Sequence, residues 1–250
     1  METVYNCRRY QYETGEHITF YHHAINTGKE KPEDSLLNKT HDTSDRTPEA
    51  EKHAMAVSAS RAKNNVYRIA RSNSWDWFIT LTFDRKKVDA SDYDLVVQRL
   101  NDFLWHIKER KCPDMKYLIV PELHADKEHY HFHGLLANVD NLTFKAWKVD
   151  HRKKQIIYNI TDWSYGFTTA TKVLDTGRVS SYITKYITKS VDEHLKEKRR
   201  YYYSRNCHIA EEEHFLFDEE EFRKIYADRI VYVKTVDLSL IHISEPTRRS

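Results

Sequence analysis

The chain has 250 residues, of which 40% are hydrophobic and 13% aromatic, enough to fill one domain with extensions or two small domains. Five glycines and five prolines argue against a fibrous chain, and the net charge of +2 rules out a strongly basic or acidic protein overall. Three cysteines without a Cys-x-x-Cys pair exclude a disulfide framework, and the absence of a long apolar run and of a signal segment leads us to expect a cytoplasmic protein with no membrane partner.

The first half of the chain predicts an arm, a helix, a strand and a second helix. Residues 1–46 have no sustained periodicity, and we expect a partly mobile N-terminal arm there. Thr47 and Pro48 predict the start of a helix that runs to about residue 71. The aromatic and β-branched stretch 75–83 predicts a strand. Ser91 and Asp94 form a capping box for a helix with apolar residues at helical spacing up to Ile107.

The second half predicts a sheet with one more helix. We expect strands at 116–122 and 130–137, joined by a hairpin connection, then strands at 156–160 and 167–173, a helix at 179–195 and a strand at 229–236. The order indicates an α+β fold with a largely antiparallel sheet and packed helices. Residues 47–203 would form the main domain and 204–237 a C-terminal extension. Residues 238–250 resemble a translated sequencing adapter, and we expect an artefact there.

His131 and His133 lie on one face of the strand 130–137, because side chains alternate along a strand. Two imidazoles so placed can chelate a metal ion, although such a pair alone is more often hydrogen-bonded at a sheet edge. Glu122 ends the preceding strand, and a hairpin would bring its carboxylate beside the pair. Two imidazoles and a carboxylate suit Mg²⁺ or Mn²⁺ serving a phosphate substrate. His124 and His129, in the same hairpin, are alternative ligands.

The block 181–189 repeats the pattern Tyr-x-x-Lys. On a helix Tyr182 and Tyr186 fall on nearly the same side, at positions i and i+4. A tyrosine becomes a nucleophile beside a cation or a metal-polarised phosphate, and Lys185 and Lys189 could supply the cation. A helix that packs two tyrosines on the core explains the block equally well. The strand segment 78–83 would direct Thr80 and Thr82 toward the same site only if the other two motifs are functional.

The small net charge conceals separate charged runs. Basic residues gather at 145–154 and again at 196–200, where three tyrosines follow, while 211–221 is acidic. Cations contact phosphates and aromatic rings stack on unpaired bases, so these runs suit single-stranded DNA, although each alone is also typical of a solvated surface. The candidate DNA-binding residues are Lys145, Lys148, Arg152, Lys153, Lys154, Arg199 and Arg200.

Taken in order, the segments 78–83, 131–134 and 182–189 resemble the three motifs of the HUH endonuclease superfamily. The resemblance covers about residues 61–203 and is closest to replication-associated proteins of the filamentous and small icosahedral phage type. It implies a ferredoxin-like or RRM-like core whose antiparallel sheet carries the His pair, with the tyrosine helix packed across it. It also implies a rolling-circle initiator that nicks single-stranded or hairpin origin DNA and leaves a 5′-phosphotyrosyl link.

Carried onto this sequence, the resemblance makes His131, His133 and Glu122 the metal ligands. Tyr182 and Tyr186 become the candidate nucleophiles, with no basis for choosing between them, and Lys185 and Lys189 bind or stabilise the phosphate. The metal would act as a Lewis acid toward the phosphate oxygens. The sequence contains no Gly-x-x-x-x-Gly-Lys-Ser/Thr motif, so we expect a host helicase to unwind the DNA.

Three alternatives remain open. A relaxase or a transposase of the same superfamily would use the same first step. A non-catalytic RRM-like nucleic-acid-binding module would not need the set of Glu122, both histidines and both tyrosines. A zinc hydrolase with His-x-His ligands would need further ligands and leaves the tyrosine helix unexplained.

Overall fold

The computed structural model describes residues 4–13, 15–26, 47–152, 154–189 and 198–229. These fall into two compact units: a larger one that holds the described residues from 47 to 211, and a smaller one formed mainly by residues before 27 and after 211. The strand predicted at 229–236 and the adapter-like segment 238–250 lie outside the described residues, except that Arg229 ends a short 3-10 helix, Ala227–Arg229.

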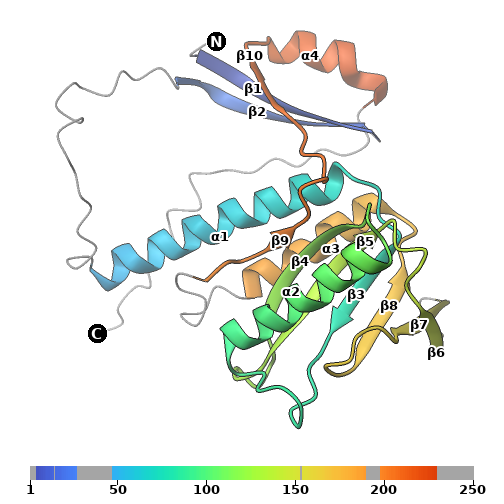
Figure 1. The fold of residues 1–250 in the computed structure, drawn as a ribbon. Coiled ribbons are helices and arrows are strands. Elements are labelled where there is room, and N and C mark those ends of the chain that lie inside the picture. The colour runs from blue at the N-terminus through green and yellow to red at the C-terminus, as the bar shows by residue number, and fades with distance from the viewer. Residues whose placement is uncertain (1–3, 14, 27–46, 153, 190–197, 230–250) are drawn as a thin grey trace. The chain divides into compact units, whose positions relative to one another are not determined.

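The larger unit is built on an antiparallel sheet whose described strands have the order β6-β7-β8-β3-β5-β4-β9 (Figure 1). Their bounds are β3 Trp77–Leu81, β4 Lys116–Leu123, β5 Tyr130–Ala137, β6 Phe144–Asp150, β7 Gln155–Ile160, β8 Thr168–Lys172 and β9 Tyr202–Tyr203. Helix α2 (Tyr93–Arg110) connects β3 to β4, and β5 lies between these two strands, which is the split β-α-β arrangement of ferredoxin-like sheets. The predicted α+β class is confirmed.

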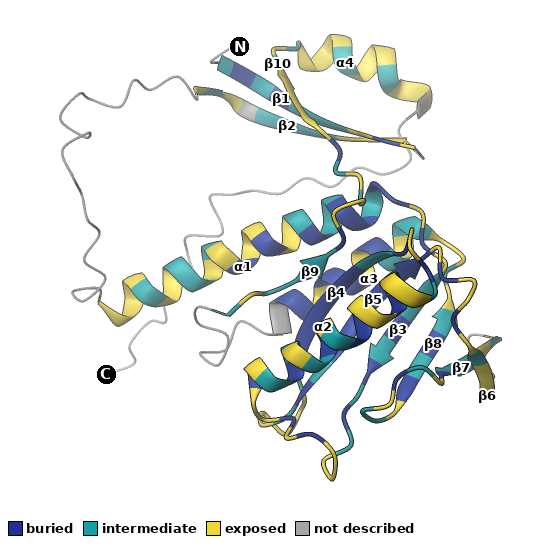
Figure 2. Cartoon of the chain, viewed as in Figure 1, coloured by how far each residue is buried: buried dark blue, intermediate teal, exposed yellow. Residues whose placement is uncertain are grey.

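Two hydrophobic cores cover the two faces of this sheet. The first joins α2 to residues such as Ile79, Phe132 and Leu136. The second joins the opposite face, with Leu118, Val120 and Leu135, to helices α1 (Pro48–Arg71) and α3 (Thr176–Lys189). The alternation predicted for the strands is the cause, because odd and even residues of β5 enter different cores. Figure 2 shows the central strands buried and the hairpin β6–β7 largely exposed.

The helix boundaries reflect local capping. Thr47 caps α1 with a hydrogen bond from Ala50 N to its Oγ1 (3.3 Å), as its sequence predicts. The capping box predicted at Ser91 is wrong, because the Ser91 hydroxyl donates to Asp89. Asp92 caps α2 instead, accepting from the backbone of Asp94 and Leu95 (2.9 and 3.1 Å). A short polar side chain at either position reads alike in sequence, so only the local turn decides which one caps.

Gly134, in the middle of β5, allows the strands beside it to pack closely. A Cβ atom there would lie 2.3 Å from Ile119 Cδ1 of β4 and 3.3 Å from Ile79 Cγ1 of β3. Both isoleucines are fully buried in the core under α2. The missing side chain therefore makes room for its neighbours on either side, directly next to His133.

Two elements of the larger unit differ from the sequence prediction. Strand β6 lies where only a basic run was recognised, because its residues are mostly exposed and give no apolar alternation. Helix α3 begins at Thr176 rather than 179, and the Asp175 side chain accepts from Arg178 N (3.0 Å) at its start. The predicted continuation of this helix beyond residue 189 lies outside the described residues.

The smaller unit contains a three-stranded sheet of order β10-β1-β2 and helix α4 (Glu219–Tyr226). Its strands are β1 Val4–Tyr12, β2 Gly15–Asn26 and β10 Glu212–Phe215, where the sequence shows no periodicity. In β1, Tyr5 and Cys7 are buried, and Tyr5 stacks on His214 of β10 at a centroid distance of 3.9 Å. Burial raises the pKa of the Cys7 thiol to about 11. Strand pairing over such a sequence separation cannot be recognised from local pattern.

Candidate metal centre and tyrosine pair

Glu122, His131 and His133 converge at the end of the β4–β5 hairpin. The register sets Glu122 directly opposite His131, and His133 follows two residues later on the same face. Glu122 Oε2 lies 2.6 Å from His133 Nε2 and 3.3 Å from His131 Nε2. One ligand atom from each residue lies within 4.8 Å of the others, so the group could hold a metal ion. The sequence prediction that Glu122 lies beside the pair agrees with this geometry.

Burial gives this group its chemical character. Glu122 and His133 are each 7% exposed, and His131 is only partly exposed. A carboxylate with this little access to water needs compensating partners, and two imidazole nitrogens supply them. The same donor set, two nitrogens and a carboxylate oxygen, is the kind that binds a divalent cation at a partly open site.

Thr80 of β3 orients one of the two imidazoles. Its Oγ1 lies 3.1 Å from His133 Nδ1, on the side of the ring away from Glu122. The residues Thr80 and His133 are direct partners in the β3–β5 register. A hydrogen bond at one ring nitrogen fixes the tautomer and direction of the other, as around many metal-binding histidines. Thr82, which we expected beside Thr80, forms backbone hydrogen bonds with Phe167 and Trp163.

Tyr186 of α3 packs directly on the histidine pair. Its ring stacks on that of His133 with centroids 3.6 Å apart and an interplanar angle of 16°. The side chain is buried, and its hydroxyl donates to the Tyr182 hydroxyl (2.9 Å). Burial raises the pKa of Tyr186 above its ordinary value, and the hydrogen bond to Tyr182 and the charge of Glu122 raise this pKa further. Tyr186 is therefore a protonated donor at neutral pH.

Tyr182 occupies a different environment, one helical turn earlier. It is 40% exposed, it accepts the hydrogen bond from Tyr186, and the Lys185 ammonium lies 5.4 Å from its ring centroid. Phe78 of β3 contacts its ring edge-on with centroids 5.2 Å apart. Of the two predicted lysines, Lys185 is exposed beside the tyrosines, whereas the side chain of Lys189 lies outside the described part of the chain.

Helix α3 holds the tyrosines at this position through its apolar side. Ile183 and Ile187 are fully buried in the core between α3 and the sheet. Because residues i and i+4 lie on neighbouring positions of a helix, burying these two isoleucines brings Tyr182 and Tyr186 to the edge of the sheet above His133. Phe78, which contacts both tyrosine rings and His133, was not predicted as a site residue. The strand alternation that directs Thr80 to the site could have identified it.

The alternative ligands His124 and His129 have another partner. His129 Nδ1 lies 2.9 Å and His124 Nδ1 3.6 Å from Asp126 Oδ2, within the β4–β5 connection. Hydrogen bonds from the backbone of Glu128 hold the pKa of Asp126 below its usual range. The His124 ring contacts that of His131 with centroids 5.1 Å apart, but the convergent group found among the described residues is Glu122, His131 and His133.

The candidate DNA-binding residues separate into two sets. Lys145 and Lys148 belong to β6, at one edge of the sheet, and Arg152 and Lys154 follow in the turn to β7. Arg199 and Arg200 precede β9, at the opposite edge, where burial lowers the pKa of Arg200. Lys153 lies outside the described residues. The structure therefore does not bring the two sets together on one patch.

Comparison with protein families gives a match over the part of the chain that holds this site. Residues 76–191 match the model of the replication-associated protein ORF2 family, a segment that begins just before β3 and extends past α3. This match confirms the family resemblance and implies DNA as a partner. No curated protein and no solved structure matches the chain. Among the described residues, no helix has the length and apolar character that crossing a membrane requires.

Proposed function

Because residues 76–191 belong to the replication-associated protein ORF2 family, we propose that the protein nicks and rejoins single-stranded origin DNA to initiate rolling-circle replication. The observation that carries the proposal is the stacking of Tyr186 on His133, which puts two tyrosine hydroxyls beside a Glu-His-His group. A binding module without catalysis has no need for this combination.

Glu122, His131 and His133 would hold a divalent cation. Two imidazoles and one carboxylate with further positions left for water or phosphate favour Mg²⁺ or Mn²⁺ over a closed structural zinc site. When bound, the cation supplies Lewis-acid stabilisation of the phosphate oxygens. Thr80 keeps His133 directed toward Glu122, so the ligand set is preorganised before DNA binds.

We propose Tyr182 as the nucleophile of the first nick. Its exposed ring can reach a DNA phosphate, whereas Tyr186 is buried between α3 and the sheet. The Tyr182 oxygen loses its proton to solvent and attacks phosphorus, the bond from phosphorus to the 3′-oxygen breaks, and that oxygen leaves as a 3′-hydroxyl after taking up a proton. The Tyr186 hydroxyl donates to the attacking oxygen and stabilises the charge that gathers there.

The 5′-phosphotyrosyl link conserves the energy of the broken phosphodiester bond. A free 3′-hydroxyl can therefore attack the same phosphorus later, release Tyr182 and rejoin the strand without another energy source. Lys185, beside the tyrosine rings, is suited to binding the phosphate during both steps. Unwinding of the duplex would depend on a host helicase.

The test is a search for a covalent protein–DNA adduct. The full chain is incubated with Mn²⁺ and a panel of end-labelled single-stranded hairpin oligonucleotides, and adducts are separated on denaturing gels. We expect an adduct that Tyr182→Phe abolishes and that Tyr186→Phe slows by about tenfold, the size typical of losing one hydrogen bond to a developing charge.

Tyr158→Phe is the matched control, because this half-buried tyrosine packs on Trp77, on the face of the sheet away from the histidines. It should form the adduct at the rate of the parent protein. An adduct that persists in Tyr182→Phe and disappears in Tyr186→Phe would reverse our assignment of the nucleophile. Intact DNA throughout the panel, with metal present, would contradict the proposed function.

A further inference from the structure

The face of the sheet that carries the histidines continues across three more strands. Thr80 of β3 contacts His133, and its partner in the β3–β8 register is Thr169. Partners in adjacent strands project to the same side, so Thr169 shares the face of His133. By the same alternation Phe167, two residues before Thr169, also lies on this face. Helices α1 and α3 pack mainly at the other end of the sheet, on β4 and β5.

A β-bulge in β6 brings two neighbouring residues to this face together. Ala146 pairs with Tyr158, which packs on Trp77 in the core under α2. After the irregularity between Ala146 and Lys148, the partner of Lys148 is Ile157, which points to the opposite side from Tyr158. Without the bulge Trp147 and Lys148 would point to opposite sides. With it, both point to the side of the histidines.

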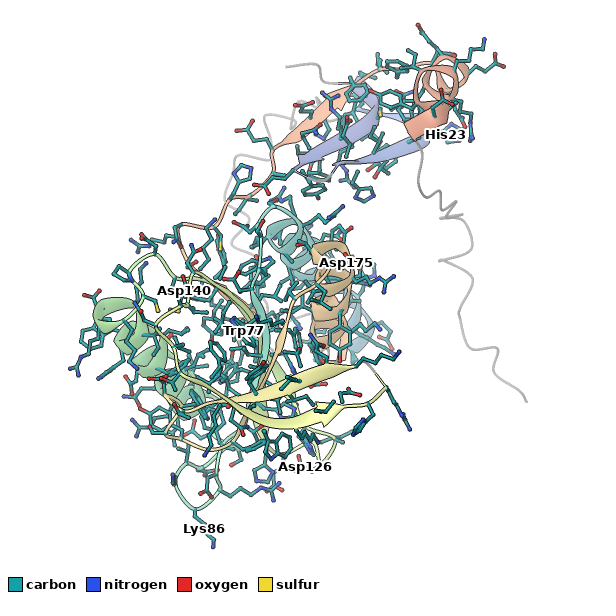
Figure 3. All side chains as sticks on the ribbon, turned by 90° about the vertical axis from the view of Figure 1, so that its right-hand side faces the viewer. His23, Trp77, Lys86, Asp126, Asp140 and Asp175 are labelled. Carbon is teal, nitrogen blue, oxygen red and sulfur yellow. The ribbon has the colours of Figure 1, made fainter. Side chains whose placement is uncertain are left out.

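Trp147 and Phe167 form an exposed pair of rings there. Their centroids lie 4.9 Å apart at an angle of 73°, and 47% of Trp147 and 44% of Phe167 are exposed. The Lys148 ammonium lies 4.2 Å from the Trp147 ring centroid. A large aromatic surface left in water beside a cation is the arrangement on which single-stranded nucleic acids stack. Figure 3 views the unit from this edge of the sheet, with the hairpin β6–β7 toward the reader.

The charge of the hairpin matches the same ligand. Residues 144–160 contain five lysines and arginines and a single carboxylate, that of Asp150. Lys145 pairs with Asn159, and the register directs both to the side of the histidines. A strand of DNA along this face would thus meet cations for its phosphates and rings for its bases. An apolar protein partner would have no use for this excess of cations.

We propose that Trp147 and Phe167, with Lys145 and Lys148, form a stacking platform that holds single-stranded DNA on the histidine face, a few nucleotides from the scissile phosphate. The choice of ligand rests on the proposed function. Between β5, which carries the histidines, and β6 lie four strand spacings, or about 19 Å along the sheet. That span suits a strand of a few nucleotides, within the site sizes of about 4 to 16 found for single-strand-binding sheets.

The test measures binding apart from chemistry. The full chain is titrated into a fluorescein-labelled single-stranded 16-mer in EDTA, and anisotropy gives Kd. We expect Trp147→Ala to weaken binding about 5- to 150-fold, the range for loss of one stacked base, and Trp147→Phe to retain most of it. A duplex of the same sequence should bind more weakly and be nearly insensitive to Trp147→Ala.

Ile156→Ala is the matched control. Ile156 is 43% exposed on β7, and its partner Val149 in β6 lies past the bulge, so it occupies the opposite face. Equal Kd values for Trp147→Ala and the parent protein would overturn the platform, as would equal losses in Trp147→Ala and Ile156→Ala. A change of molecular mass in solution with unchanged DNA affinity would make the surface a protein contact instead.

The two proposals fail separately. Normal stacking in EDTA together with no adduct in Mn²⁺ would leave the platform in place and remove the nickase. An adduct formed at the parent rate and affinity by Trp147→Ala would leave the nickase and remove the platform. The far-ultraviolet and near-ultraviolet circular dichroism of each variant checks that the exposed substitution leaves the fold intact.

Discussion

The two ends of the large sheet are built on opposite principles. At the β4–β5 end, Glu122 and His133 are almost completely buried and bound to each other, and Tyr186 covers them. At the β6–β7 end, Trp147 and Lys148 are exposed to water beside Phe167. Buried polar groups cost free energy unless every partner is present, so the first end is rigid and intolerant of change. The second end can vary in small steps, which is what graded binding of a strand requires.

The largest expected effect is at the buried end. Glu122→Gln keeps the size and a hydrogen-bonding oxygen but removes the carboxylate charge that a cation needs. We expect the rate of adduct formation to fall at least about 100-fold at fixed Mn²⁺, because a Lewis acid contributes several kcal/mol to such reactions. The measurement is the initial rate of adduct formation over a Mn²⁺ titration, with isothermal titration calorimetry for the metal affinity.

His129→Ala serves as the control for this substitution, since His129 lies in the same hairpin but pairs with Asp126. A parent-like rate in Glu122→Gln would show that the carboxylate is not a ligand. A large loss in His129→Ala would transfer the ligand role to the loop and break the contrast between a buried site and its exposed surroundings.

Much of the buried end could be predicted from sequence because its order is local. Strand β5 has the predicted bounds, and a hairpin with side chains of period two brings Glu122 to His131 without knowledge of any other element. The tyrosine spacing likewise follows from helix geometry alone. What could not be predicted is which of Tyr182 and Tyr186 is buried, because that depends on how α3 lies on the sheet.

The unpredicted features depend on contacts between segments far apart or on exposed residues. Strands β1 and β2 pair into a sheet with β10 some two hundred residues later, and arginines and tyrosines hide their alternation. The bulge in β6 is invisible in sequence, because exposed strands carry no apolar pattern from which a shift of register could be noticed. The pairing of Trp147 with Phe167 follows from that bulge, so it could not be predicted either.

A smaller effect is expected one step away from the ligands. Thr80→Val preserves shape but removes the oxygen 3.1 Å from His133 Nδ1. Loss of a partner that orients a ligating histidine weakens metal affinity about 10- to 100-fold, and we expect that range here. The measurement is the Mn²⁺ concentration at half-maximal adduct formation, which should rise while the rate at saturating Mn²⁺ changes little.

Thr171→Val is the comparison for this variant, because Thr171 lies two residues beyond Thr169 on the neighbouring strand β8, opposite Phe78 in the register. It should leave the Mn²⁺ requirement unchanged. An unchanged requirement in Thr80→Val as well would mean that burial alone, without this hydrogen bond, orients His133.

The smallest effect is expected at the exposed end, where single cations contact phosphate. Lys145→Ala and Lys148→Ala should each reduce the slope of log Kobs against log salt concentration for single-stranded DNA by about 0.7, the contribution of one phosphate contact. Lys172→Ala is the matched control, because its ammonium lies over Trp77, on the face away from the histidines. Anisotropy titrations from low to moderate salt give the slopes. If Lys172→Ala lowers the slope as much as the β6 lysines do, the DNA does not follow the histidine face, and the two ends of the sheet do not cooperate on one strand.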